Sequence, residues 1–157
     1  MIRTITNKKK FILIIILLCS LYACIDEKEK CEDELLSTRH FETEFGCENT
    51  RFDLQIDLHN EYTIIRSKNT YDNNVTGICH PEIDFSKYDL VIGSQSTGNF
   101  NDTILYDYRR VCPNMDLTLT IDVIQLYITM PSTVTYHALI PKLGDEESID
   151  IIVNVYP

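Results

Sequence analysis

The chain has 157 residues, of which 24 are Asp or Glu and 14 are Lys or Arg, so its formal net charge is −10. This length has room for one domain. A strongly acidic surface repels phosphate backbones and anionic lipid headgroups, which argues against nucleic-acid binding and against attachment to a membrane by charge.

The first 23 residues have the pattern of a secretory signal peptide. Arg3 and three lysines at 8–10 precede an unbroken apolar run at 11–18. A basic start followed by a short apolar core is typical of such signals. The run is too short for a transmembrane helix, which needs about 20 apolar residues. The alternatives are a cleaved signal of a soluble secreted protein and an uncleaved anchor helix.

The end of this segment resembles the lipobox of bacterial lipoproteins. Leu21, Ala23 and Cys24 occupy the −3, −1 and +1 positions, with an unusual Tyr22 at −2. In that family the signal peptide is removed before the cysteine, whose sulfur is acylated. The resemblance therefore implies that Cys24 is lipidated, for example with palmitate, and holds the protein to a membrane.

The residues that follow Cys24 carry a second resemblance. The acidic cluster at 26–29 resembles the export signal that sends lipoproteins of Bacteroidetes-type bacteria to the outer face of the outer membrane. It implies a surface-exposed outer-membrane lipoprotein, with a periplasm-facing anchor as the alternative. Removal of residues 1–23 takes away four basic residues and no acidic one, so the mature net charge is −14.

Composition divides the mature chain into two parts. Residues 24–44 are rich in Glu, Asp and Lys, which predicts an acidic flexible tether with a helical turn near 32–36. A single folded domain is predicted over residues 45–157.

Alternation of apolar and polar residues with a period of two is typical of half-buried strands. Seven segments of the domain show it or are shorter candidates: 52–58, 62–67, 88–95, 103–110, 117–123, 134–140 and 149–155. Short helical turns are predicted at 67–74 and 84–87. The fold class is therefore mainly β: an antiparallel β-sandwich of about seven strands, or a partly closed barrel. Antiparallel pairing is expected because the links are short.

Four cysteines lie beyond the signal peptide and the lipidation site: Cys31, Cys47, Cys79 and Cys112. An even number in an exported chain suggests two disulfides, with three possible connectivities. No Cys-x-x-Cys pair is present, so a thioredoxin-like redox role has no support.

Hairpin geometry favours one connectivity. If 88–95 and 103–110 pair around the turn at 98–99, Cys112 lies at the base of the hairpin and close to Cys79. This predicts a Cys79–Cys112 disulfide, which leaves Cys31–Cys47 as the second.

The C-terminal half resembles a known domain. The Asp-Phe-Ser-Lys segment at 84–87 enters a strand, Gly98-Asn99-Phe100 forms a turn, and a late strand contains 133–137. Over residues 83–156 these features resemble the C-terminal domain of PrcB-type protease-complex subunits, a small secreted β-domain. The paired glycine of that family is Gly98-Asn99 here, so the turn departs from the pattern. The resemblance implies an accessory or binding domain without a catalytic site.

Two groups of residues invite a chemical interpretation. Cys79-His80 would suit a thiol nucleophile assisted by His137 or Asp84, but a disulfide at Cys79 removes the thiolate. The histidines lack the short spacing of a zinc site, and no metal or cofactor is predicted. They are His40, His59, His80 and His137.

His137 shares its strand face with Thr133 and Thr135, which predicts a solvent-exposed position. Asp102-Thr103-Ile104 resembles the short O-glycosylation motif of exported Bacteroidetes proteins, which implies a glycan on Thr103.

The sequence predicts a non-enzymatic, lipid-anchored cell-envelope protein whose sandwich is a binding or accessory module for a protein or glycan. One alternative is a structural or adhesin-like subunit of a surface assembly, which would expose an apolar edge strand such as 149–156. The other is a small hydrolase, which would need a pocket with convergent side chains of perturbed pKa. No Gly-x-Ser-x-Gly, phosphate-loop or His-Glu-x-x-His motif is present.

Overall fold

The computed structural model describes residues 31–59 and 61–157. The predicted signal peptide and Cys24 lie outside the described residues. The compact unit comprises Glu32–Pro157. It is mainly β, with strands in three sheets and three short helices, and this confirms the sandwich-like fold class.

The larger sheet, called the outer sheet, has the strand order β1-β6-β7-β9. Its strands are Glu34–Leu36, Asn101–Val111, Asp116–Gln125 and Ile149–Tyr156. The central sheet has the order β3-β5-β8. Its strands are Tyr62–Ile65, Tyr88–Thr97 and Ser132–Pro141.

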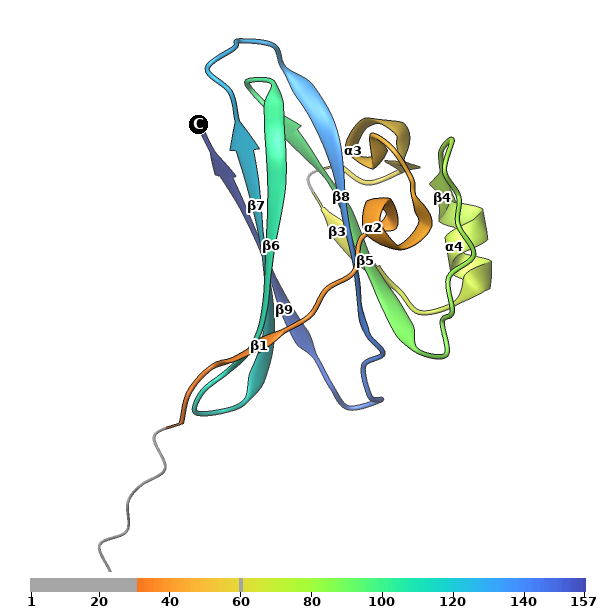
Figure 1. The fold of residues 1–157 in the computed structure, drawn as a ribbon, viewed down its shortest axis with the longest axis vertical. Helices are drawn as coiled ribbons and strands as arrows, with labels where there is room; N and C mark the ends of the chain where they lie inside the picture. The colour runs from red at the N-terminus through yellow and green to blue at the C-terminus, as the bar shows by residue number, and fades with distance from the viewer. Residues whose placement is uncertain (1–30, 60) are drawn as a thin grey trace, which may run out of the picture. The chain divides into compact units, whose positions relative to one another are not determined.

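A third layer of short elements covers the other face of the central sheet (Figure 1). It contains the helices α2 (Phe41–Phe45), α3 (Thr50–Asp53) and α4 (Lys68–Asn74) and the strand pair β2 (Gln55–Ile56) and β4 (Val75–Thr76). Helix α4 confirms the helical turn predicted at 67–74, and the hydroxyl of Ser67 caps it by accepting from the backbone N–H of Thr70.

The central sheet is therefore buried on both faces. One apolar cluster lies between the two sheets and includes Leu119, Ile121, Tyr136 and Ile140. A second cluster lies between the central sheet and the third layer and includes Phe41, Leu54, Tyr71, Leu90 and Leu139.

The strands β5 and β6 do not form a hairpin, contrary to the sequence prediction. β5 pairs with β3 and β8, whereas β6 pairs with β1 and β7. The turn at Gly98 and Asn99 carries the chain from one sheet to the other, where Asn99 N–H donates to the side-chain oxygen of Gln125 at 2.8 Å.

Pairing is not antiparallel throughout. β7 and β9 run parallel, with Leu117 opposite Ile149 and Ile124 opposite Tyr156. The chain between them is long enough for this crossover because β8 passes through the central sheet on the way. The prediction of an antiparallel sandwich is wrong for this pair and right for the other pairs of strands in the described residues.

The predicted tether is partly folded. β1 pairs with β6, and Phe41, which lies inside the predicted tether, is fully buried. The folded domain thus begins before residue 45. The strand predicted at 52–58 is also wrong in part, because its first residues belong to α3 and only Gln55–Ile56 is a strand. An alternating pattern in so short a segment does not separate a helical turn from a strand.

Candidate functional site

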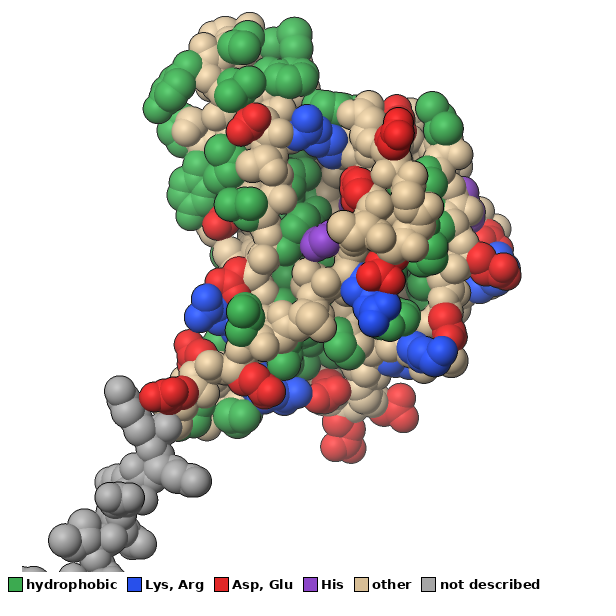
Figure 2. Space-filling model, viewed as in Figure 1, with side chains coloured by type: hydrophobic (Ala, Val, Ile, Leu, Met, Phe, Trp, Pro, Cys, Tyr) green, Lys and Arg blue, Asp and Glu red, His purple; other side chains and the backbone are tan. Residues whose placement is uncertain are grey.

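A cavity of about 480 Å³ lies between β6, β8 and the segment that contains α2 and α3. This volume is within the usual range for small-ligand pockets, roughly 300–1,000 Å³. β6 contributes Thr103, Ile104 and Tyr106, β8 contributes Thr135 and His137, and the other lining residues belong to 40–51. Figure 2 shows a hollow on this face, with histidine (purple) and a basic side chain (blue) at its margins.

Local chain geometry places the 40–51 segment over β8. Helix α2 ends at Gly46, whose φ of 68° is a left-handed conformation that suits glycine at a helix C-terminus. Asn49, at φ 54°, then begins α3. The two short helices thereby bring Glu42 and Thr50 to the same side of the cavity.

His137 reaches the cavity from β8 and is only 3% exposed. The backbone N–H of Phe41 donates to its Nε2 at 3.2 Å, and this requires a lone pair on Nε2 in the neutral ring. The ring of Phe41 also packs against the imidazole, with ring centroids 4.4 Å apart. The prediction that His137 is solvent-exposed is therefore wrong, because α2 covers this face of β8.

The same imidazole offers two alternative contacts. Oε2 of Glu42 lies 3.4 Å from Nε2 of His137, so a proton on Nε2 would replace the hydrogen bond from Phe41 with one to Glu42. The other ring nitrogen, Nδ1, is buried and has no hydrogen-bond partner among the described residues. A buried polar atom of this kind is uncommon in a folded protein and calls for a specific explanation.

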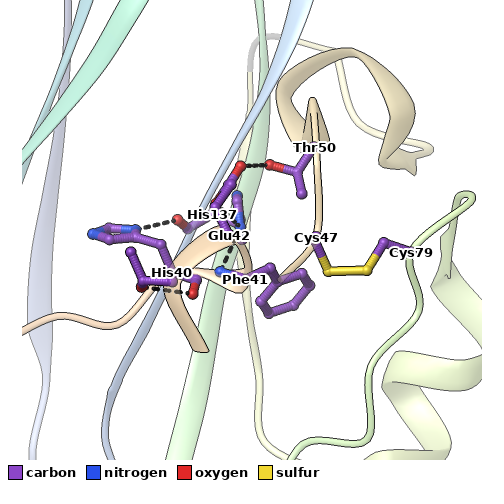
Figure 3. Close-up of a disulfide and its surroundings, with 8 residues drawn as sticks. His40, Phe41, Glu42, Cys47, Thr50, Cys79 and His137 are labelled. Carbon is purple, nitrogen blue, oxygen red and sulfur yellow. Dashed lines mark hydrogen bonds and ion pairs between the residues drawn. A yellow bond between two sulfur atoms is a disulfide. The ribbon is translucent and has the colours of Figure 1, made fainter. Parts of the chain in front are cut away.

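Glu42 is held in its ionised form. Burial of the carboxyl group acts to raise its pKa, but the contact with His137 and the hydrogen bond that the Thr50 hydroxyl donates to Oε1 outweigh burial and lower the pKa to about 2. Figure 3 shows Glu42 directed toward Thr50, with the ring of Phe41 on the side of the disulfide. The cavity therefore contains a fixed negative charge at neutral pH.

Two further rings complete this wall. The rings of His40 and Tyr106 are in contact, with their centroids 4.5 Å apart and their planes tilted by 39°. The backbone N–H of His137 donates to Oη of Tyr106 at 3.1 Å, which leaves the hydroxyl hydrogen of Tyr106 for another acceptor. Burial lowers the pKa of His40 and raises the pKa of Tyr106, so both side chains are largely neutral at pH 7.

Arg51 supplies a positive charge. Its Nη1 donates to Oδ1 of Asn101 at 3.1 Å and to the backbone carbonyl of Asp102, and its guanidinium lies 5.1 Å from the centroid of Phe52. These contacts fix the guanidinium next to β6. The charges of Arg51 and Glu42 are opposite, so the cavity is close to neutral overall.

The wall of the cavity is fixed by a disulfide between Cys47 and Cys79, whose Cα atoms are 5.7 Å apart (Figure 3). It links the connection between α2 and α3 to the chain after β4. The predicted pairs Cys79–Cys112 and Cys31–Cys47 are therefore wrong, because they depended on a β5–β6 hairpin that does not form. Cys31 and Cys112 are also disulfide-bonded, and the oxidised state predicted for Cys79 is confirmed.

The structure brings some of the other predicted residues to the cavity. Thr103 lies in β6 and lines the cavity, and its glycosylation stays a prediction. His40 and His137 are neighbours, with centroids 6.3 Å apart. His59 and His80 are exposed and do not line the cavity, and His80 stacks on Tyr71 instead. Within the described residues there is no group of three or more His, Cys, Asp or Glu side chains that could hold a metal.

Sequence reasoning missed Glu42, Thr50 and Arg51. The first lies in the segment interpreted as a tether. The sequence does contain a pattern that could have identified this segment as folded. Phe41 and Phe45 are four residues apart and Gly46 follows them, which predicts a short helix with one apolar side.

The arrangement is suited to recognition. It offers one ionised carboxylate, one guanidinium and several neutral donors and acceptors on backbone held by β6 and β8. Glu42 is the only carboxylate in the described lining, whereas most glycoside hydrolases use two. It also stands between Thr50 and His137, which is the wrong order for a nucleophile–histidine–acid relay.

No helix in the described part of the chain is both long enough and apolar enough to cross a membrane. Comparison with family models, with curated proteins and with solved structures finds no match to this chain.

Proposed function

We propose that this chain is a lipid-anchored, non-catalytic binding module of the bacterial cell envelope, displayed on the outer membrane. The lipobox at Cys24 and the acidic residues after it support the anchor and the location. The cavity at His137 supports the binding role. The accessory role implied by the resemblance to PrcB-type subunits is in agreement with this proposal.

The ligand that fits the cavity best is a small neutral polar group, such as one sugar unit of a glycan. Opposite charges at Glu42 and Arg51 disfavour a strongly charged ligand, since either sign meets a like charge. Hydroxyl groups can both donate and accept, and the lining presents carboxylate, guanidinium, hydroxyl and amide partners for them. Ile104 provides an apolar contact beside these groups.

The observation that carries this proposal is the ionised Glu42 beside Nε2 of His137, whose other ring nitrogen is buried without a partner among the described residues, in a cavity large enough for a ligand. Burying polar atoms without partners costs free energy, so such atoms are retained where they serve recognition or a change of hydrogen-bonding state.

A panel of neutral and anionic mono- and oligosaccharides, measured by isothermal titration calorimetry on the full chain, tests the ligand class. We expect a neutral member to bind, and Glu42→Gln to weaken it by about tenfold or more, the effect of losing one charged hydrogen bond. Glu44→Gln is the matched control, because Glu44 lies on the same helix but pairs with Arg39 and does not line the cavity.

Equal losses in both variants, or no binding by any member of the panel, would contradict the proposal. Release of shorter sugars from a bound oligosaccharide, detected by mass spectrometry, would instead favour the small hydrolase.

The anchor has a separate test. Cys24→Ser should abolish incorporation of labelled palmitate and leave a precursor that no longer partitions into detergent. Continued labelling of that variant would show that the lipobox assignment is wrong. A protease added to intact cells should degrade the wild-type protein if it is on the outer surface, and should spare it if the anchor faces the periplasm.

A further inference from the structure

The last strand, β9, has an open edge. It pairs along its whole length with β7, and no strand within residues 31–59 and 61–157 pairs with its other side. A terminal strand presents backbone N–H and C=O groups that can bind an added strand. β9 has eight residues, whereas β1 at the opposite edge of the outer sheet has three.

The edge lacks the usual protection against strand addition. Natural edge strands are often interrupted by a lysine, a proline or a bulge. β9 contains no Lys, Arg or Pro, and its register with β7 is unbroken. Apolar side chains are exposed in the middle and at the end of the strand, with Ile152 at 46% and Tyr156 at 45%.

Apolar side chains continue beyond the C-terminal end of β9. Tyr156 lies opposite Ile124 near the end of β7, and the loop that follows β7 exposes Tyr127 at 91% and Ile128 at 55%. Met130 of the same loop is also exposed. Figure 2 shows apolar side chains gathered at the upper left, the side on which Figure 1 marks the C-terminus.

The opposite end of β9 is acidic. The link from β8 to β9 contains Asp145, Glu146 and Glu147, all exposed, and Asp150 follows within the strand. Glu147 lies 3.9 Å from Arg110, but no ion pair involves Asp145 or Glu146 among the described residues. Red side chains gather at the lower end of the same view in Figure 2. The edge therefore has a negative end and an apolar end.

We propose that the β9 edge binds an extended segment of a partner protein as a fifth strand of the outer sheet. The segment is basic where it passes residues 145–147 and aromatic or aliphatic where it passes Tyr156. A second copy of this chain is a poorer occupant. Its β9 has no basic residue for the acidic end, and two mature chains of net charge −14 repel each other.

Synthetic peptides test the proposal. The probes are Lys-Lys-Thr-Val-Thr-Val-Thr-Val-Tyr, its reversed sequence, and the two versions with Glu-Glu in place of Lys-Lys. Binding to the full chain in detergent is measured by fluorescence anisotropy, and the contact is located by backbone amide NMR. Of the two lysine peptides, which differ in chain direction, we expect one to bind about tenfold or more tightly than the glutamate version of the same sequence. The NMR signals of backbone amides along β9 should shift when it binds.

Charge reversal provides the control. Asp145→Lys with Glu146→Lys should invert the preference between the two peptides. Glu48→Lys with Glu82→Lys makes the same change in net charge at exposed positions outside the outer sheet and should leave the preference in place. Absence of lysine-peptide binding, or a preference that the first variant does not alter, would overturn the proposal. So would dimerisation through β9 in sedimentation experiments, which would assign the edge to a second copy.

Discussion

Tyr136 lies across Gly93 on the neighbouring strand, so close that a Cβ at residue 93 would be 2.3 Å from the phenolic oxygen. The same Cβ would be 2.6 Å from the backbone carbonyl of Glu61, to which the Tyr136 hydroxyl donates at 3.3 Å. The absence of a side chain at Gly93 thus allows the tyrosine ring to cross β5. Burial raises the pKa of Tyr136 to about 12, so this hydroxyl remains a donor over the whole physiological range.

Gly93→Ala should destabilise the protein by about 1–3 kcal/mol or more, because it forces an overpacked contact that includes backbone. Chemical denaturation measures the loss. Gly98→Ala is the control, since a Cβ there meets no atom within 4 Å, and it should change stability little. Similar losses in the two variants would show that Tyr136 and its surroundings adjust freely.

Replacing Cys47 and Cys79 together by serine should lower the free energy of unfolding by roughly 3–4 kcal/mol, the chain-entropy value for a loop closed across 32 residues. Denaturant titration gives the magnitude. Peptide mapping without reduction should recover Cys47 and Cys79 in one linked fragment. A fragment that links Cys79 to Cys112 would instead restore the hairpin connectivity that the fold contradicts.

Glu42 should contribute stability that depends on pH. Its pKa falls from 4.5 to about 2 on folding, so the contribution is fully present above about pH 4.5 and is lost as pH falls toward 2. The side chain of Glu42 is 42% exposed, so solvent screens its charge interactions. We therefore expect it to contribute only about 1 kcal/mol to the free energy of unfolding. Denaturation of wild type and Glu42→Gln at pH 6 and pH 2.5 measures it. The difference between the proteins should shrink at the lower pH, and a constant difference would contradict the assignment.

The two faces of β9 should respond differently to substitution. Ile151 packs against the apolar cluster between the sheets, so Ile151→Ala should lower the free energy of unfolding by about 2 kcal/mol. This value is at the low end for isoleucine because the residue is only half-buried. Ile152 is 46% exposed, and Ile152→Ser should change stability by less than about 0.5 kcal/mol. Melting temperatures compare the pair. Equal effects would mean that both faces of β9 are covered.

The alternating segments were the predictable part of the fold. The predictions for β7, β8 and β9 succeeded because their apolar residues recur every second position, as in 117–123, and face a continuous core. The pattern fixes which face of a strand is apolar, but it does not say which strand lies beside it. The pattern therefore predicts a hairpin of β5 and β6, although these strands belong to different sheets.

The candidate site was harder to predict because its burial comes from the third layer. Thr135 and His137 have the polar character of an exposed strand face, yet α2 and α3 cover them, and the Thr135 hydroxyl donates to the carbonyl of Leu54 at 2.7 Å. Helices of four or five residues leave too short a pattern for periodicity to identify. The cavity depends on contacts between residues far apart in the chain, such as Phe41 and His137, which are 96 positions apart.

The position of β1 in the sequence sets an upper limit on the distance between the folded domain and a lipid attached to Cys24. If Cys24 carries the anchor, as we propose, only ten positions separate it from Glu34, where pairing with β6 begins. Ten fully extended residues span at most about 35 Å, and the predicted tether of residues 24–44 would have allowed about twice that reach. Under that proposal the start of β1 stays within about 35 Å of the lipid headgroups, which favours ligands that belong to the cell surface itself over those held at the end of a long stalk.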